Sequence, residues 1–358
     1  MFAFVAASVA TLLIMWGSRL PLAGADSLGD IAAWLAGGLA AVAFAASYLI
    51  EARRGFAHWR RRLPLVKRGV DLIAMTAAMA MLSYLLVTAI AQLFQLGFVG
   101  LTIDPIGGAV LAGAAVAVFV YAAALAGARV TSEGLATLAA LLLFIGTMAS
   151  MLSSPDESWW QLHFSQLGNS GGTTGYRFNL SLILTGLVVT ALANHIAHDI
   201  ERGLAARDAP APRLVAVLAW LFAGIGICMT IAGIVPDAVN IVIHVGAASG
   251  MVVLFGVFLF CSLRYVPDLP RDFAVVSLLV VAGILVSIAL WVPIGYYNLT
   301  GMEFIAAGLL FGWLILFVRT AAVYAEPGAP TTIRFGEKGI LRLAITVRTP
   351  GCHGAYTH

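Results

Sequence analysis

The sequence predicts an all-α integral membrane protein, a bundle of about ten transmembrane helices with both termini in the cytoplasm. Hydrophobic residues make up 61% of the 358 residues and charged residues only 10%, whereas soluble domains have roughly 45–50% and 25%. The mean hydropathy is +0.98. Most apolar residues also fall in runs long enough to cross the roughly 30 Å hydrocarbon core of a bilayer. Together these observations exclude a soluble, a disordered and a fibrous protein.

Ten apolar runs follow one another along the chain, and each is interpreted as one helix. They cover residues 2–17, 31–50, 70–95, 106–127, 135–152, 178–197, 214–235, 239–262, 273–294 and 302–323. The first run has an alternative interpretation as a cleaved signal peptide, because Ala23-Gly24-Ala25 resembles a small-residue cleavage site. No basic segment precedes this run, which favours a retained helix.

The basic residues predict the orientation of the bundle. With the N-terminus in the cytoplasm, 18 of the 20 Lys and Arg residues fall in cytoplasmic segments, and only Arg19 and Arg177 lie outside. Such an excess of positive charge on one side is typical of the cytoplasmic face. Arginine far outnumbers lysine, and alanine and glycine are abundant, as in proteins of GC-rich bacteria. We therefore expect a multi-pass protein of the bacterial inner membrane.

The expected organisation has three parts. Residues 1–134 hold four helices, residues 135–325 form a six-helix membrane domain with an outward-facing polar pocket, and residues 326–358 form a cytoplasmic tail that we expect to be mobile. The basic loop Glu51–Arg68 is interpreted as a topology determinant or as a patch for anionic lipids. A net charge of +3 is too small to indicate nucleic acid as a partner. Membrane lipids are the expected partners, and protein partners are not predicted.

Common enzyme signatures are missing from the sequence. It has no GxxxxGK[ST] phosphate-binding loop, no HExxH zinc motif and no GxSxG nucleophile elbow. These absences argue against ATP-driven transport by this chain alone and lean against an enzyme. No cofactor is expected.

One intramembrane histidine indicates a site. The eighth run is expected to begin as a helix at Pro236, which would place Asp237, Asn240 and His244 on one stripe. His244 would then lie about 10 Å along the helix from Asp237. Because an ionisable side chain is costly in hydrocarbon, it is a functional candidate unless a neighbour simply satisfies it within the packing.

The polar segment before the sixth helix offers partners for this histidine. It carries His163 and Ser165, and Asn179 follows at the helix start. We expect Ser165, Asn179, Asp237 and His244 to line one polar cavity, with His163 and Asn240 beside them as ligand-binding residues. Two chemistries remain open there: a metal site made by His163, Asp237 and His244 that activates water, and a Ser–His pair for acyl transfer.

Three short motifs resemble a known family. Ser165–Gly168 (Ser-x-Leu-Gly), the pair Phe178-Asn179 and the segment Pro236–His244 resemble the bacterial domain-of-unknown-function family 998, over about residues 135–325. The resemblance implies a multi-pass membrane protein but no reaction. A looser similarity to alkaline-ceramidase-like membrane hydrolases implies Ser, Asp and His chemistry, although their pair of histidines on the last helix has no match here.

Other polar side chains are interpreted without a function. His195, His198 and Asp199 are expected to be exposed at the cytoplasmic end of the sixth helix, without a metal. Asp71 and Glu303 are interpreted as acids at helix starts, where the helix dipole favours them.

The leading hypothesis is recognition or movement of a small or lipidic ligand at the outer leaflet, without covalent catalysis. The rival from another class is a metal-dependent membrane hydrolase at the same pocket. A third possibility is a structural or assembly subunit of a membrane complex.

Overall fold

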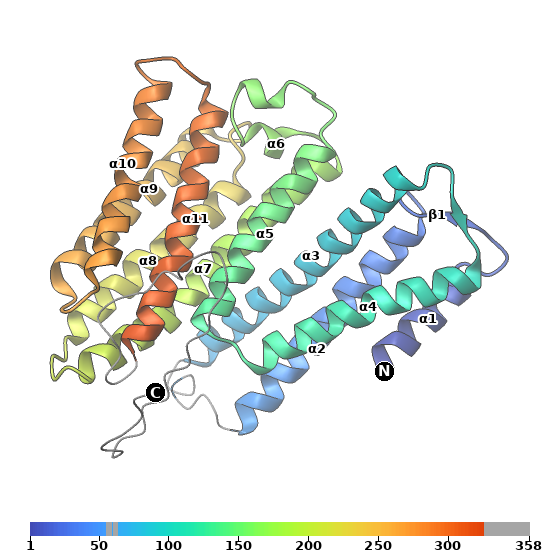
Figure 1. Ribbon diagram of the computed structural model, residues 1–358, viewed down its shortest axis with the longest axis horizontal. Coiled ribbons are helices and arrows are strands. Elements are labelled where there is room, and N and C mark those ends of the chain that lie inside the picture. Colours follow the sequence, from blue (N-terminus) through green and yellow to red (C-terminus); the bar gives the residue numbers. More distant parts are fainter. Residues whose placement is uncertain (55–58, 60–63, 326–358) are drawn as a thin grey trace, which may run out of the picture.

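The structure, a computed structural model, describes residues 1–54, 59 and 64–325, which fold almost entirely into helices (Figure 1). The helices are α1 (Phe2–Ile14), α2 (Leu28–Arg54), α3 (Leu65–Gly97), α4 (Pro105–Ala128), α5 (Ser132–Leu152), α6 (Gln166–Asn169), α7 (Thr173–Ala205), α8 (Pro212–Ile234), α9 (Ile241–Tyr265), α10 (Arg271–Trp291) and α11 (Leu299–Tyr324). A 3₁₀ turn covers Trp159–Gln161, and two strands, β1 (Leu20–Pro21) and β2 (Thr102–Ile103), pair antiparallel. The expected all-α membrane fold is confirmed.

Within the described ranges, nine helices are long and apolar enough to span a membrane. The tenth expected span, residues 2–17, is wrong in its length: α1 has 13 residues, about 20 Å at 1.5 Å per residue. That is short of the hydrocarbon thickness. The chain leaves the helix through a turn in which Gly17 adopts a φ of +79°, a conformation that glycine tolerates and that ends a right-handed helix.

The connections gather at two ends of the bundle. At one end, Leu20 pairs with Ile103, which joins the α1–α2 and α3–α4 loops, and the Asn298 amide donates to the Trp160 carbonyl, which joins the α10–α11 and α5–α7 loops. We call this the α6 end. At the opposite end, Arg207 Nε lies 4.0 Å from Asp268 Oδ2. The alternation agrees with the expected up-and-down path, and the choice of the α6 end as the outer one remains a prediction from charge.

Helix α7 is the centre of the bundle. Of the 18 residues in its most apolar stretch, 61% are buried inside the protein, against 22–44% in the corresponding stretches of the other spanning helices. It packs on α3, α5, α8 and α11. The approach to α8 is close enough that a β-carbon at Gly186 would lie 2.5 Å from the Gly226 carbonyl oxygen. Small residues permit such contacts, which supply packing energy where lipid provides no hydrophobic drive.

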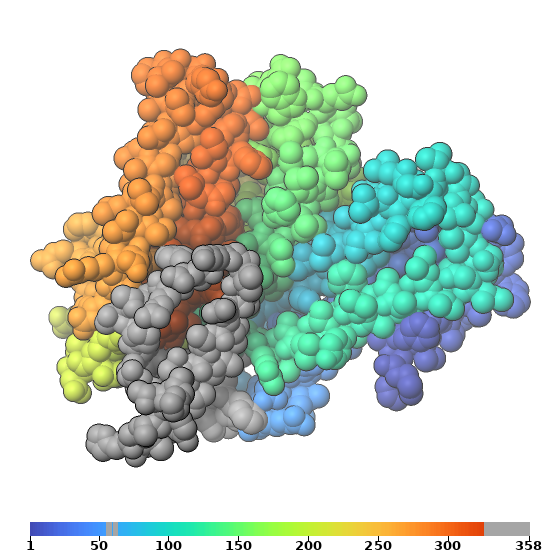
Figure 2. Space-filling model, viewed as in Figure 1, coloured from blue at the N-terminus to red at the C-terminus, as the bar shows by residue number. Residues whose placement is uncertain are grey.

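The first four helices form a lobe beside the rest, coloured blue to teal in Figures 1 and 2. The lobe has its own small core, which includes Met15, Ala33 and Val116. The division of the chain at residue 134 stays an expectation. The expected mobile tail (326–358) and the basic loop at 55–58 and 60–63 lie outside the described residues.

Candidate functional site

A loop between α5 and α7 covers the helix ends at the α6 end. The Asn179 side-chain amide of α7 donates to the Gly168 carbonyl at 2.9 Å, and the Asn169 side-chain oxygen accepts from the Ala238 backbone amide at 3.3 Å. Trp159 and Leu167 of the loop are buried against Phe178 of α7, whereas Trp160 is 52% exposed. The loop is therefore anchored at several points.

Near its start the loop has a turn held by a carboxylate. Asp156 Oδ1 accepts from both the backbone amide and the hydroxyl of Ser158, at 2.8 and 2.7 Å. These bonds, the hydroxyl bond foremost, lower the pKa of the Asp156 carboxyl, since they stabilise its ionised form.

The central contact of the site joins Ser165 to His244. Ser165 Oγ lies 2.8 Å from His244 Nε2, and His244 Nδ1 lies 2.9 Å from the Val235 carbonyl and 3.1 Å from the Ala232 carbonyl. Carbonyl oxygens only accept hydrogen bonds, so in the neutral ring the proton resides on Nδ1 and Nε2 accepts from the serine. His244 is 7% exposed, and both of its nitrogens are satisfied.

A second pair lies beside the first. His163 Nε2 is 3.3 Å from Asp237 Oδ2, and Glu303 Oε2 accepts from the Phe164 backbone amide at 2.7 Å. Glu303 interacts electrostatically with His163, His244 and Asp237. The site therefore combines side chains from the covering loop, the α8–α9 connection, α9 and α11. We call His163, Ser165, Asp237, His244 and Glu303 the outer cluster.

The structure brings the predicted residues together in pairs. Ser165 contacts His244 directly, Asp237 contacts His163, and Asn179 binds the backbone of the loop that carries Ser165. The sequence predicts that Ser165, Asn179, Asp237 and His244 share one hydrogen-bonded network. The described bonds join these residues in separate pairs instead. Asn179 acts through the position of the loop.

The expected helix start at Pro236 is wrong. Helix α9 begins at Ile241, and Asn240 is its N-cap: the backbone of Asn240 is extended and its side-chain oxygen accepts from the Ile243 amide at 3.1 Å. Asp237 therefore reaches His163 from a turn and not from a helical stripe. Asn240 is exposed, and its described side-chain bond is this cap.

Sequence reasoning missed Glu303 as a site residue. It stands five residues into α11, which Asn298 caps, and it binds the covering loop. Asp71 was also misplaced: α3 begins at Leu65, so Asp71 lies almost two turns inside, where it accepts from the Asn194 side-chain amide at 3.3 Å. Both acids are helix-interior residues that contact another segment. Asn298, a residue type that suits a helix N-cap, is the sequence signal that could have moved the start of α11 ahead of Glu303.

The expected exposure of His195 is also wrong. His195 is 8% exposed. Helix α7 continues ten residues beyond His195, to Ala205, and lies at the centre of the bundle, so His195 is inside the helix and not at its end. The Trp59 ring contacts it edge-on at 4.9 Å and stacks on half-buried His198 at 4.5 Å. Asp199 accepts from the Ser132 hydroxyl.

The metal alternative gains no support from the donor arrangement. Both ring nitrogens of His244 bind protein groups, so the three proposed ligands His163, Asp237 and His244 do not share a centre. Across residues 1–54, 59 and 64–325, no group of three His, Cys, Asp or Glu side chains could hold a metal ion.

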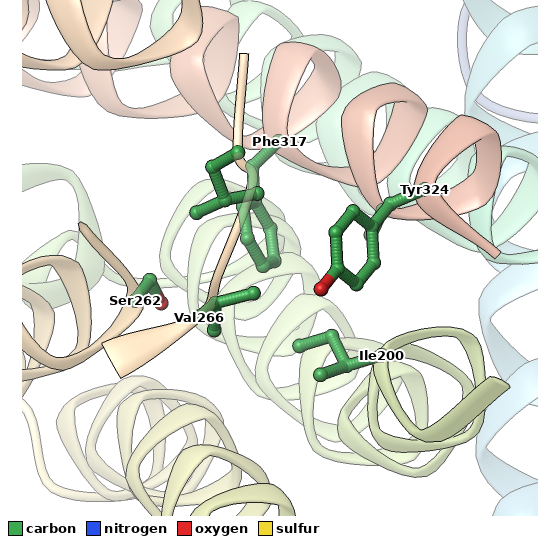
Figure 3. Close-up of a pocket in the computed structure, with 7 residues that line it drawn as sticks. Ile200, Ser262, Val266, Phe317 and Tyr324 are labelled. Atoms are coloured by element: carbon green, nitrogen blue, oxygen red, sulfur yellow. The ribbon is translucent and has the colours of Figure 1, made fainter. Parts of the chain in front are cut away.

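A small pocket at the opposite end differs in chemistry (Figure 3). It is lined mainly by apolar side chains such as Ile200, Val266 and Phe317. The Tyr324 hydroxyl beside it donates to the Pro267 carbonyl at 3.0 Å. Ser262 also lines the pocket, but among the described residues its lining includes no carboxylate or imidazole that could act as a general base for this hydroxyl.

A comparison with known families matches the part of the chain that carries the outer cluster. A family model described as "Protein of unknown function (DUF998)" matches residues 137–320, just over half of the chain. The chain belongs to the DUF998 family. The DUF998 segment begins in α5 and ends in α11, so it contains every member of the outer cluster. The predicted resemblance is confirmed over almost the predicted range.

Two further comparisons give no additional relatives. No curated protein matches the chain. No solved structure matches it.

Proposed function

We propose that this DUF998-family membrane protein recognises or moves a small or lipidic ligand at the outer leaflet, and that the outer cluster binds the ligand without covalent chemistry. The observation that carries the proposal is the convergence of Asp237, Glu303, His163 and His244 on one spot at the α6 end. These residues come from four elements of the DUF998 segment: the covering loop, the α8–α9 connection, α9 and α11. The covering loop is anchored over them.

The energetic cost of this arrangement supports a functional role. Ionisable side chains in or near hydrocarbon are expensive, and packed apolar residues would stabilise the fold better. Asp237 has a side chain only 14% exposed, yet one of its two oxygens, Oδ1, has no partner among the described residues. A buried acceptor without a donor costs about 1–3 kcal/mol. A bound ligand would relieve that cost.

An apolar surface lies beside the polar groups. Phe304, the neighbour of Glu303 in α11, is 59% exposed, and its ring stacks on Phe164 of the covering loop at 6.1 Å. A polar site bordered by membrane-facing aromatic surface fits an amphipathic ligand. This combination supports a lipidic ligand over a wholly polar one.

Acyl transfer by Ser165 is the second candidate, favoured by the Ser165–His244 bond. A hydroxyl bonded to an imidazole whose other nitrogen is oriented is the arrangement of a nucleophile and its base. Acyl transfer also needs free donors for the oxyanion. The backbone amides of Phe164, Gln166 and Gly168 already donate to Glu303, His163 and Ser165, respectively. Binding is therefore the better supported function.

The experiment separates these functions. The full-length protein, reconstituted in nanodiscs, is incubated with a polar lipid extract from bacterial membranes and analysed by native mass spectrometry. We expect one lipid mass retained intact, with occupancy reduced at least fivefold by Asp237→Asn. Glu157→Gln, which alters an exposed acid of the same loop, is the matched control and should retain the lipid.

Two results would contradict the proposal. Deacylated lipid that accumulates with the wild type and not with Ser165→Ala would establish the acyl-transfer alternative. If no lipid is retained and all variants give equal spectra, the binding function is wrong and a structural subunit is the hypothesis that remains.

A further inference from the structure

The hydrogen-bonding groups of the outer cluster are unbalanced. Ser165 has a single hydroxyl proton, which His244 Nε2 accepts when the ring is neutral. Asp237 Oδ2 is near His163 Nε2, but Asp237 Oδ1 is buried without a partner among the described residues. The unmet need at this site is thus for a donor. A ligand group that only accepts hydrogen bonds would not satisfy it.

The charges of the cluster point the same way. Two carboxyl groups, Asp237 and Glu303, are close enough to interact. The other charged or titratable groups that act on Glu303 are His163 and His244, and neither is a lysine or an arginine. Two carboxyl groups without a permanent cation favour a positive ligand group, which stabilises their ionised form, over a phosphate or carboxylate, which would be repelled.

The ligand also has an apolar part, for the reason given by Phe304. This exposed ring follows Glu303 directly and faces away from the protein interior. A chain that runs along it would place its polar end at Glu303 and Asp237. Burial of an alkyl chain contributes about 0.8 kcal/mol per CH₂ group, so chain and head would both contribute.

From these observations we infer that the ligand is a cationic amphiphile, a primary ammonium group on an apolar chain, with Asp237 and Glu303 as the groups that bind the ammonium. This inference rests on the proposed binding function and narrows it to one ligand class. The ammonium supplies three N–H donors and one positive charge. Asp237 Oδ1 would accept one of the donors.

A set of four probes with the same chain tests the charge and the donors separately. Radiolabelled dodecylamine is bound to the full-length protein in phosphatidylcholine nanodiscs, with empty nanodiscs subtracted, and is competed with dodecyltrimethylammonium, dodecanol or laurate. We expect dodecylamine to bind most tightly. Dodecyltrimethylammonium, which has the charge but no N–H donor, should compete at least fivefold more weakly, and dodecanol and laurate should compete more weakly still.

The variants assign the binding to the two carboxylates. Asp237→Asn and Glu303→Gln keep the size of each side chain and remove its charge, and each should weaken dodecylamine binding at least tenfold. Glu157→Gln should leave the affinity unchanged. Two separate variants keep the test decisive if one of them does not yield folded protein.

The outcomes distinguish this inference from the proposed function. If laurate or dodecanol competes as well as dodecylamine, or if both carboxylate variants bind dodecylamine like the wild type, the ligand class is wrong. Retention of a lipid from the bacterial extract would in that case still support the binding function. If neither dodecylamine nor any extracted lipid binds, both the class and the binding function fail.

Discussion

A single methyl group at Gly168 should detach the loop that carries Ser165. A β-carbon at position 168 would lie 2.4 Å from Asn179 Oδ1 and 3.2 Å from Phe178 Cδ1. Phe178 is 7% exposed and packed beneath the loop, so the Asn179 amide is the group that must move. Gly168→Ala therefore breaks the bond from Asn179 to the Gly168 carbonyl.

The size of the effect follows from that bond. A buried polar group that loses its partner costs about 1–3 kcal/mol, which is a factor of roughly 5–150 in a local opening equilibrium. The loop amides of Gln166 and Leu167 donate to His163 and Phe164 in the folded loop. Their hydrogen exchange, measured by mass spectrometry in nanodiscs, should accelerate by that factor, because exchange reports local opening.

Gly171→Ala is the matched control three residues along the same loop. A β-carbon there meets no atom within 4 Å, so exchange at Gln166 and Leu167 should stay at the wild-type rate. Equal exchange in the two variants would refute the anchoring role of Asn179, and with it the explanation of how α7 positions Ser165.

Three further predictions concern topology, packing and pH. Cysteines are placed singly at Arg60 and Ser170 in a background that lacks Cys228, Cys261 and Cys352. Because the charge distribution predicts that the α6 end is outside, an impermeant reagent should label position 170 and not position 60 in intact cells. The reverse pattern would overturn the orientation. Gly186→Ala should lower the free energy of unfolding by about 1–3 kcal/mol, because the added methyl group overpacks against α8. Gly256→Ala, with open space around its β-carbon, should leave it unchanged. Equal melting temperatures for the two variants in detergent would contradict the close packing of α7 on α8. Ser158→Ala should raise the lowered pKa of Asp156 back toward its ordinary 3.8, as measured by ¹³C-carboxyl titration. A lowered carboxyl pKa stabilises the folded turn above the unfolded pKa, and this contribution is lost as pH falls through the folded pKa, so the turn should depend less on pH in the variant. An unchanged titration would exclude the Ser158 bond as the cause.

The sequence by itself determined the membrane class and nine of the ten predicted spans. Insertion into a bilayer depends on the length and composition of each segment, which are local properties. The same local reasoning overestimated α1, because the apolar run continues through Met15 and Trp16 after the helix has ended at Ile14. It also placed Ser165, Asp237 and His244 at one end of the bundle, because alternating spans return every second loop to the same side.

Local signals competed at the start of α9, and the tertiary structure decided between them. Pro236 suits the first turn of a helix, and Asn240 suits the N-cap. The cap at Asn240 is the one used, and the Ala238 amide donates to Asn169 of the covering loop. Asp237 is thereby left in a turn, where it meets His163.

Only the tertiary structure showed which polar side chains share a site. Glu303 joins the outer cluster through a loop amide 139 positions earlier in the chain, and His195 is buried because α7 is surrounded on several sides. In a soluble helix, polar residues mark the outer face. In a membrane helix, lipid is as apolar as the protein interior, so the sequence of an apolar run does not state which face turns inward. The packing of the helices against one another makes that choice.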